Sequence, residues 1–514
     1  MKNKPLPWHT LLVAIYPPLY LFSQNVERLE LAELVIPIPA ITALAALSLA
    51  VLYLILRDLP KAALVATPAW LLFWYYTDLY WFIEPWKIGD FWIGRQRYLA
   101  TVLAVVLVAV FFVVWRSRKK HENLTRILNV VAACLVLMAA GTVVSYRVTN
   151  ARARTATVST SDMVAFEGPL PDVYYVILDG YGRQDILADL MDFDNSAFIE
   201  GLRSRGFYVA DKACSNYGQT QLSLASSLNL DYVQALPVHL DPCTDDRLPL
   251  NRLYRGGKVF AFFQNEGYSL VSFATGFNPT ELLQADIYVT GHSDLTNYQT
   301  MLLGQTPLQL MKRFLVERQF DHHRSRIIQA MEQLGAAQVA PKFIFAHLVS
   351  PHPPFLFGSE GQLVTDYHKY DMGDGSHRFK RTGMTTDEYI AYYRDQVTYL
   401  NTLVLAAVDD VLANSPEPPI IIIQGDHGPG SHLHWESLED TYLPERLSIL
   451  NAYYFPDGDY SQLYPEITPV NSFRIILSQY FGQDYAPLPD HSYYSTWEAP
   501  YAFSDVTPIV APRD

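Results

Sequence analysis

Hydrophobic residues follow two different patterns along the 514-residue chain. In the first 150 residues they gather into five apolar stretches, each close to the length of about 20 residues that a helix needs to cross the bilayer core. These stretches are residues 8–24, 34–56, 62–83, 98–115 and 127–146. Tryptophans lie in them or at their ends, as in the aromatic belts of membrane proteins. The pattern predicts a transmembrane domain of five helices over residues 1–150.

The polar part of the chain begins with a linker at 151–170 that is rich in Ser, Thr and small residues. Beyond it, short β-branched and aromatic runs alternate with helical stretches. The strands predicted here are 173–178, 342–349, 419–424 and 447–455, and the clearest helices are 221–230 and 387–412. This alternation predicts an α/β domain with a central, mostly parallel sheet over residues 171–514. Ligands of such sheets bind beyond the carboxyl ends of the strands.

Charge indicates on which side of the membrane this domain lies. The loop between the fourth and fifth stretches holds the strongest basic cluster, Arg116, Arg118, Lys119 and Lys120. Under the positive-inside rule this loop is cytoplasmic, so residues after the fifth span lie outside the cytoplasmic membrane. There Cys214 and Cys243 are able to form a disulfide. The net charge of −14 excludes a nucleic-acid partner, because phosphate backbones need basic surfaces.

Acidic and imidazole side chains follow two of the predicted strands. Asp179 comes directly after strand 173–178, and Asp426 with His427 follows a run of four isoleucines. A carboxylate and an imidazole in tandem at a strand end make a half-site for a divalent metal. The structural alternatives are a helix-capping role for Asp179 and a turn at Asp426.

Two further elements offer a nucleophile and additional histidines. Thr220 begins a predicted helix, where free N–H groups and the helix dipole favour anions, although a simple N-cap is the alternative. A hydroxyl there becomes a nucleophile if a divalent cation lowers its pKa. His347 and His352 follow a strand, and prolines stiffen the loop around His352. Both histidines are candidates for contacting an anionic substrate.

Together these motifs resemble the alkaline phosphatase superfamily, in particular its sulfatase-like branch, over about residues 171–485. Asp179 matches the first metal ligand of that family, Thr220 its nucleophile, and Asp426 with His427 its paired late ligands. The resemblance implies that these four residues hold a divalent ion, zinc or manganese. His352 resembles a late histidine that contacts the substrate phosphate or a second metal. His432 or His434 is the candidate for a second such role.

Five spans followed by an outward catalytic domain look like lipoteichoic acid synthase, the phosphoglycerol transferases and the phosphoethanolamine transferases. Those enzymes use a threonine, whereas sulfatases use a formylglycine made from Cys or Ser, so Thr220 favours the transferases. The chain departs from both patterns, because sulfatases have a second Asp where Gly180 stands and the transferases commonly have Glu in place of Asp179. The transferred group stays open at this point.

The resemblance implies a multi-pass enzyme of the cytoplasmic (inner) membrane. It would move a phosphoglycerol- or phosphoethanolamine-like group from a membrane lipid to a glycan or lipid acceptor of the cell envelope, through a phospho-threonine. The alternatives are an extracytoplasmic phosphatase, phosphodiesterase or sulfatase that uses water as acceptor, and a non-catalytic envelope scaffold.

Overall fold

The computed structural model describes residues 5–26, 29, 31–89, 91–118, 121–149, 163–238, 240–289, 295–308, 312–337, 339–364 and 370–510. The chain forms two compact units. The first contains Met1–Arg152 and Leu295–Phe314, and the second contains Ala153–Asp294 and Leu315–Asp514. Residues 151–162 of the predicted linker, and Lys119 and Lys120 of the basic loop, lie outside the described residues.

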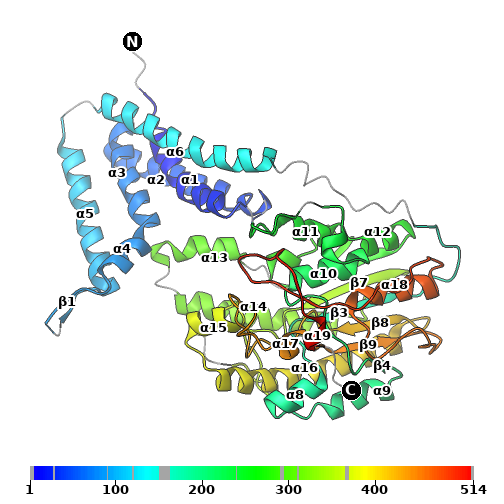
Figure 1. Cartoon of the computed structure of the whole chain (residues 1–514). Coiled ribbons are helices and arrows are strands. Elements are labelled where there is room, and N and C mark those ends of the chain that lie inside the picture. Colours follow the sequence, from blue (N-terminus) through cyan, green and yellow to red (C-terminus); the bar gives the residue numbers. More distant parts are fainter. Residues whose placement is uncertain are drawn as a thin grey trace. The chain divides into compact units, whose positions relative to one another are not determined.

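The first unit is helical, and its helices fall on all five predicted apolar stretches (Figure 1). They are α1 His9–Gln24, α2 Pro37–Leu56, α3 Leu59–Trp74, α4 Tyr76–Ile83, α5 Gln96–Arg116 and α6 Glu122–Thr149. The unit also contains the 3-10 turn η1 Leu31–Leu34 and a small hairpin of β1 Lys87–Ile88 and β2 Phe91–Trp92. One further helix of this unit, α13 Asn297–Gly304, comes from much later in the chain. Among the residues that the structure describes, three helical segments are long and apolar enough to cross a membrane: Leu31–Leu56, Gln96–Arg116 and Glu122–Thr149. Three of the five predicted spans therefore have the length and composition of a membrane-crossing helix, and the first and third predicted spans are shorter.

The two shorter stretches have local reasons for their length. The third predicted span breaks at Tyr75, which separates α3 from α4. In α1, Pro17 and Pro18 lack the N–H groups that would bond to carbonyls one turn earlier. The indole Nε1 of Trp74 donates to the carbonyl of Ala14 at 3.0 Å, so a neighbouring helix satisfies one of the groups that the prolines leave free.

The second unit is built on a seven-stranded sheet with the strand order β4-β9-β8-β3-β7-β5-β6. Its strands are β3 Val173–Leu178, β4 Tyr208–Val209, β5 Ser269–Phe273, β6 Ile287–Val289, β7 Lys342–Leu348, β8 Ile420–Gln424 and β9 Asn451–Tyr454. All pairs are parallel except those of β9, which is antiparallel to both β4 and β8. The sheet is thus mixed, with a parallel centre as predicted.

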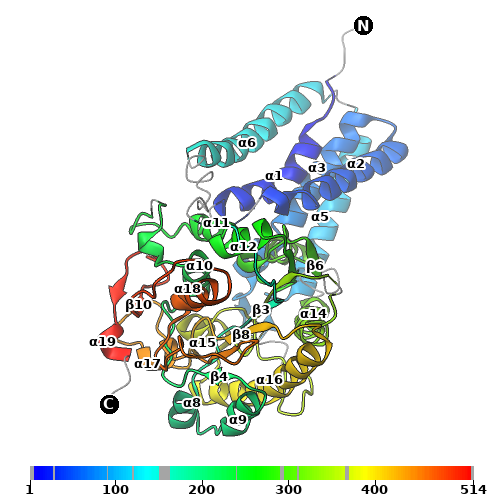
Figure 2. The ribbon, with the colours of Figure 1, turned by 90° about the vertical axis from the view of Figure 1, so that its right-hand side faces the viewer.

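Helices cover both faces of this sheet (Figures 1 and 2). The helices of this unit are α8 Gln184–Met191, α9 Ser196–Ser204, α10 Thr220–Asn229, α11 Leu248–Arg255, α12 Lys258–Asn265, α14 Lys312–Glu332, α15 Gly375–Thr382, α16 Thr386–Asn414, α17 Leu443–Leu447, α18 Pro469–Tyr480 and α19 Thr507–Val510. Short 3-10 turns lie at Val233–Ala235 and Asn278–Thr280, and β10 Tyr493–Tyr494 pairs with β11 Ser504–Asp505. Alternate residues of β3 pack into separate cores beneath the two helical layers.

The predicted disulfide is not formed. Cys214 and Cys243 are both free thiols, Cys214 buried and Cys243 exposed. The Cys214 sulfur lies 3.6 Å from a guanidinium nitrogen of Arg183, inside the folded unit.

Candidate active site

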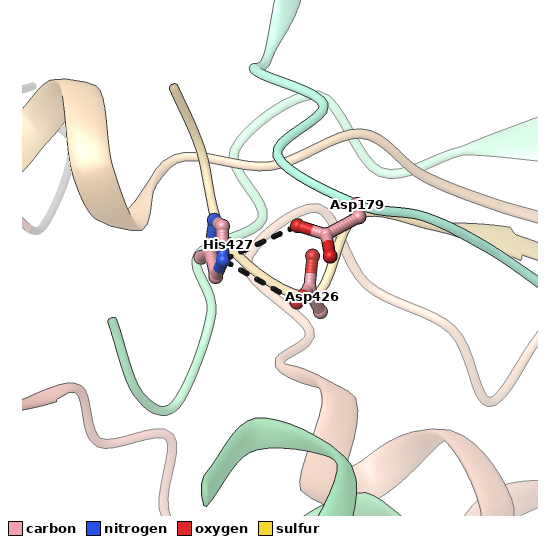
Figure 3. Close-up of side chains that lie close together, drawn as sticks. All are labelled: Asp179, Asp426 and His427. Carbon is pink, nitrogen blue, oxygen red and sulfur yellow. Dashed lines mark ion pairs between the residues drawn. The ribbon is translucent and has the colours of Figure 1, made fainter. Parts of the chain in front are cut away.

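Three ligand-bearing residues meet at the carboxyl edge of the sheet. Asp179 follows β3 directly, and Asp426 and His427 come just after β8. The two strands are parallel neighbours, so their carboxyl ends lie at the same edge. One ligand atom from each of the three buried side chains lies within 4.8 Å of the others (Figure 3). These three residues are called the acid–histidine cluster below.

The imidazole of His427 is oriented as a ligand. Its Nδ1 lies 2.9 Å from the carbonyl oxygen of Gly428, so Nδ1 carries the proton and Nε2 presents a lone pair. That Nε2 is 3.4 Å from Asp179 Oδ1 and 3.4 Å from Asp426 Oδ2. Burial, aided by the positive charge of Arg446, lowers the pKa of His427. The ring is therefore neutral at pH 7, the form that binds metals.

The hydroxyl of Thr220 faces the cluster. Gln219 occupies the N-cap position of α10, without a side-chain capping bond, and Thr220 is the first helical residue. Its Oγ1 lies 3.1 Å from His427 Nε2. The simple N-cap alternative is therefore wrong, and the hydroxyl stands at a helix end that favours anions.

The charges of the cluster fit a divalent cation. Asp179 Oδ1 and Asp426 Oδ2 are buried and have no hydrogen-bond partner among the described residues. Burial would raise the pKa of Asp179, but His352, His347 and His427 together hold that pKa well below its usual range. Unpaired buried carboxylates are costly unless a cation compensates them. Two carboxylates, an imidazole and a hydroxyl are ligands that suit zinc or manganese.

Two of the predicted histidines border the cluster. His347 lies on β7, with its Nε2 3.2 Å from Asp179 Oδ2 and its Nδ1 2.9 Å from Thr280 Oγ1. The ring centroid of His352 is 6.1 Å from that of His427. Its Nδ1 lies 2.5 Å from the carbonyl oxygen of Pro353, and its Nε2 lies 3.9 Å from Asp374 Oδ2. The structure thus brings both residues to the site.

The other two predicted histidines are exposed. His432 Nδ1 lies 3.1 Å from Glu445 Oε2, and His434 bonds to Thr441 through its backbone N–H. No contact joins either imidazole to the cluster within the part of the chain that the structure describes. Leu433 and Trp435 take the buried positions of this alternating segment, which turns the two histidines toward solvent.

Sequence reasoning missed a buried ion pair beside the cluster. Arg446 on α17 places Nη1 2.6 Å from Asp374 Oδ2 and Nη2 3.1 Å from His427 Nε2. Burial would raise the pKa of Asp374, yet the nearby His352 and Arg446 lower it. A lone acid in a polar loop and an arginine on a short helix carry no recognisable spacing, so no sequence signal pointed to them. The arginine adds a positive charge suited to an anionic substrate.

A glycine makes the turn after β8 possible. A Cβ at Gly428 would lie 2.0 Å from the backbone oxygen of Glu445, a distance no side chain tolerates. The Gly428 N–H donates to the Arg446 carbonyl at 2.7 Å. The turn that presents Asp426 and His427 is therefore fastened to α17, which carries Arg446.

Solved structures of low sequence identity are similar to this chain. The C-terminal periplasmic domain of EcEptC from Escherichia coli, in complex with Zn, is 13% identical with a TM-score of 0.44, over 66% of this chain and 94% of that one. The integral membrane protein lipooligosaccharide phosphoethanolamine transferase A from Neisseria meningitidis is 11% identical with a TM-score of 0.35, over 92% and 94%. No curated protein sequence matches.

A family model supplies the stronger comparison. The model named Sulfatase matches residues 166–476, which is more than half of the chain. The match contains the acid–histidine cluster, Thr220 and the ion pair of Asp374 with Arg446. The chain therefore belongs to the sulfatase family, a branch of the alkaline phosphatase superfamily, and is a sulfatase-like enzyme.

Proposed function

We propose that this enzyme is a membrane-anchored, metal-dependent transferase that carries a phospho-group on Thr220. The observation that supports this most directly is the 3.1 Å separation between the Thr220 hydroxyl and His427 Nε2, at the edge of the acid–histidine cluster. Threonine is not a precursor of the formylglycine of sulfatases. A nucleophilic hydroxyl in this position therefore favours phosphoryl transfer over sulfate-ester hydrolysis.

The donor and acceptor follow from the anchoring of the enzyme. The donor is a membrane lipid with a phosphoglycerol- or phosphoethanolamine-like head group, and the acceptor is a glycan or lipid of the cell envelope. The chain is a multi-pass protein of the inner membrane, and its catalytic unit lies on the extracytoplasmic side. The three candidate spans among the described helices support the membrane anchoring.

Asp179, Asp426, His427 and Thr220 would hold one divalent ion, zinc or manganese. When bound, the ion supplies the positive charge that keeps Thr220 deprotonated and polarises the phosphoryl group. Thr220 Oγ1 attacks phosphorus in line, its new P–O bond forming as the bond to the lipid alcohol breaks. His352 gives its Nε2 proton to that leaving alcohol. The Arg446 guanidinium binds the phosphoryl oxygens as charge develops on them.

The second half-reaction reverses these roles. The acceptor hydroxyl loses its proton to His352 and attacks the phosphorus of phospho-Thr220, and the bond to Oγ1 breaks. Both Thr220 and His352 return to their starting states, so protons balance over the cycle. Water as acceptor would give hydrolysis with the same residues.

Replacing the hydroxyl tests the nucleophile. Thr220→Ala is expected to lower turnover of phospholipid at least about a thousandfold while the protein stays folded, because no oxygen remains to accept phosphorus. Thr220→Ser keeps the oxygen and should retain measurable turnover. Head-group release from phosphatidylethanolamine or phosphatidylglycerol vesicles provides the assay. Full activity in Thr220→Ala would show that another group is the nucleophile.

A further inference from the structure

A short helix from the middle of the catalytic sequence is a built-in part of the membrane unit. Helix α13 follows β6 and precedes α14 along the chain, yet it belongs to the same compact unit as α1–α6. A capping box between Thr296 and Gln299 starts the helix, so it is a defined element.

The buried face of α13 packs against the membrane helices. Tyr298 is 0% exposed and Leu302 is 4% exposed, within an apolar cluster that includes Phe22 and Trp74. The Tyr298 ring meets Phe22 edge-on at 6.0 Å between centroids. Its hydroxyl donates to the Pro18 carbonyl at 2.7 Å.

Polar contacts fix both ends of the same helix. At its start, the Thr296 hydroxyl donates to Glu33 Oε2 at 2.5 Å. At its end, Thr77 on α4 donates its hydroxyl to the Gly304 carbonyl at 2.7 Å and its N–H to the Gln305 carbonyl at 3.3 Å. Two buried side chains and four hydrogen bonds therefore hold α13 in a specific packing site on the membrane helices.

Short segments of chain connect α13 to the elements of the catalytic unit on either side of it. Residues 290–296 join β6 to α13, and residues 305–311 join α13 to α14, so each connection spans at most about 25 Å. The linker residues 150–162 alone would span up to about 45 Å. Strands β6, β5, β7 and β3 are mutually parallel, so β6 ends at the same sheet edge as Asp179, three strand spacings or about 14 Å away.

We propose that α13 is a docking element that attaches the catalytic part of the chain to the membrane unit, independently of the 150–162 linker. Its purpose is to keep the site within reach of lipid head groups. This purpose rests on the lipid donor proposed above, whereas the docking itself does not. A soluble substrate needs no such docking element, because it reaches the active site by diffusion.

Cleavage of the linker tests the docking without any activity measurement. A protease site placed within residues 153–160 of the full-length protein is cut after reconstitution into vesicles of phosphatidylethanolamine and phosphatidylglycerol. The fragment that carries residues 161–514 is expected to sediment with the vesicles. In Tyr298→Ala/Leu302→Ala, the amount of this fragment in the supernatant should be at least about tenfold higher than for the wild-type protein. Phe22→Ala, made on the other side of the contact, should release it as well.

Met301→Ala is the matched control, because Met301 lies on the same helix and is 45% exposed. It should leave the fragment on the vesicles. Release of the wild-type fragment, or retention of the Tyr298→Ala/Leu302→Ala fragment to the extent seen with Met301→Ala, would overturn the proposal.

A second readout separates this proposal from the proposed function. The uncut Tyr298→Ala/Leu302→Ala protein should turn over vesicle phospholipid at least about tenfold more slowly than wild type, yet hydrolyse bis(p-nitrophenyl) phosphate at the wild-type rate. Equal losses of activity on the two substrates would contradict a docking role for α13. Absence of turnover in the wild-type protein would count against the transferase, while the sedimentation result would still decide the docking.

Discussion

Nitrogen Nε2 of His427 has more polar neighbours than its one lone pair can bond to. The Thr220 hydroxyl and Arg446 Nη2 each lie 3.1 Å from it, and two carboxylates lie slightly farther away. With a cation at that lone pair, an N–H of Arg446 Nη2 beside the cluster would be left to donate elsewhere. The other two guanidinium nitrogens are held by Asp374 and by the Gly218 carbonyl. The freed donor is therefore pre-oriented for a phosphoryl oxygen of the substrate.

Metal content tests the ligand assignment residue by residue. Asp426→Asn removes one negative charge from the cluster, so we expect bound zinc or manganese to fall from about one ion per chain by at least about tenfold. Elemental analysis of the purified full-length protein measures this directly. Asp185→Asn is the control, because Asp185 is a nearby carboxylate that pairs with Arg183 at 2.7 Å. Unchanged metal in Asp426→Asn would remove Asp426 from the ligand set.

Among the elements, the turn after β8 carries Asp426 and His427 and is bonded to α17, which carries Arg446. Gly428→Ala would push a methyl group into the Glu445 carbonyl, 2.0 Å away, so the turn must move. We expect a loss of about 1–3 kcal/mol in stability, with turnover lowered at least about tenfold because Asp426 and His427 shift.

Thermal unfolding and phospholipid turnover check this expectation. Gly141→Ala in α6 is the comparison, since nothing lies within 4 Å of a Cβ built there. A Gly428→Ala protein as stable and active as Gly141→Ala would show that the turn is not tightly constrained.

Several elements were predictable because their signals are local. The apolar β-branched runs predicted the bounds of β3 and β8 to within one residue. Asp179, Asp426 and His427 follow these strands as expected. The pairing of β9 was not predictable, because antiparallel and parallel partners leave the same alternating pattern in one strand. Asp374 and Arg446 meet only through tertiary folding, across 72 residues of chain. The length of α3 depends on a break at Tyr75 inside an apolar run.

At the scale of the whole molecule, the orientation of the chain in the membrane is testable with its own cysteines. Cys243 is exposed in the catalytic unit, whereas Cys214 is buried, and burial raises the pKa of its thiol. Cys134 lies within the apolar helix α6. A membrane-impermeant maleimide added to intact spheroplasts should therefore label Cys243 alone.

The Cys243→Ser protein serves as the control for that experiment and should stay unlabelled. Labelling of Cys243 only after the membrane is permeabilised would place the catalytic unit in the cytoplasm. An envelope acceptor would then be out of reach.

Peptide mass spectrometry of the intact enzyme can show whether Thr220 carries the transferred group. The purified full-length protein, loaded with zinc or manganese, is incubated with phosphatidylethanolamine and phosphatidylglycerol vesicles without an acceptor and quenched in acid. We expect a phosphoethanolamine or phosphoglycerol adduct on the peptide containing Thr220, and none in Thr220→Ala. Turnover of lipid with the adduct on another residue, or with Thr220 unmodified at every time point, would contradict this expectation.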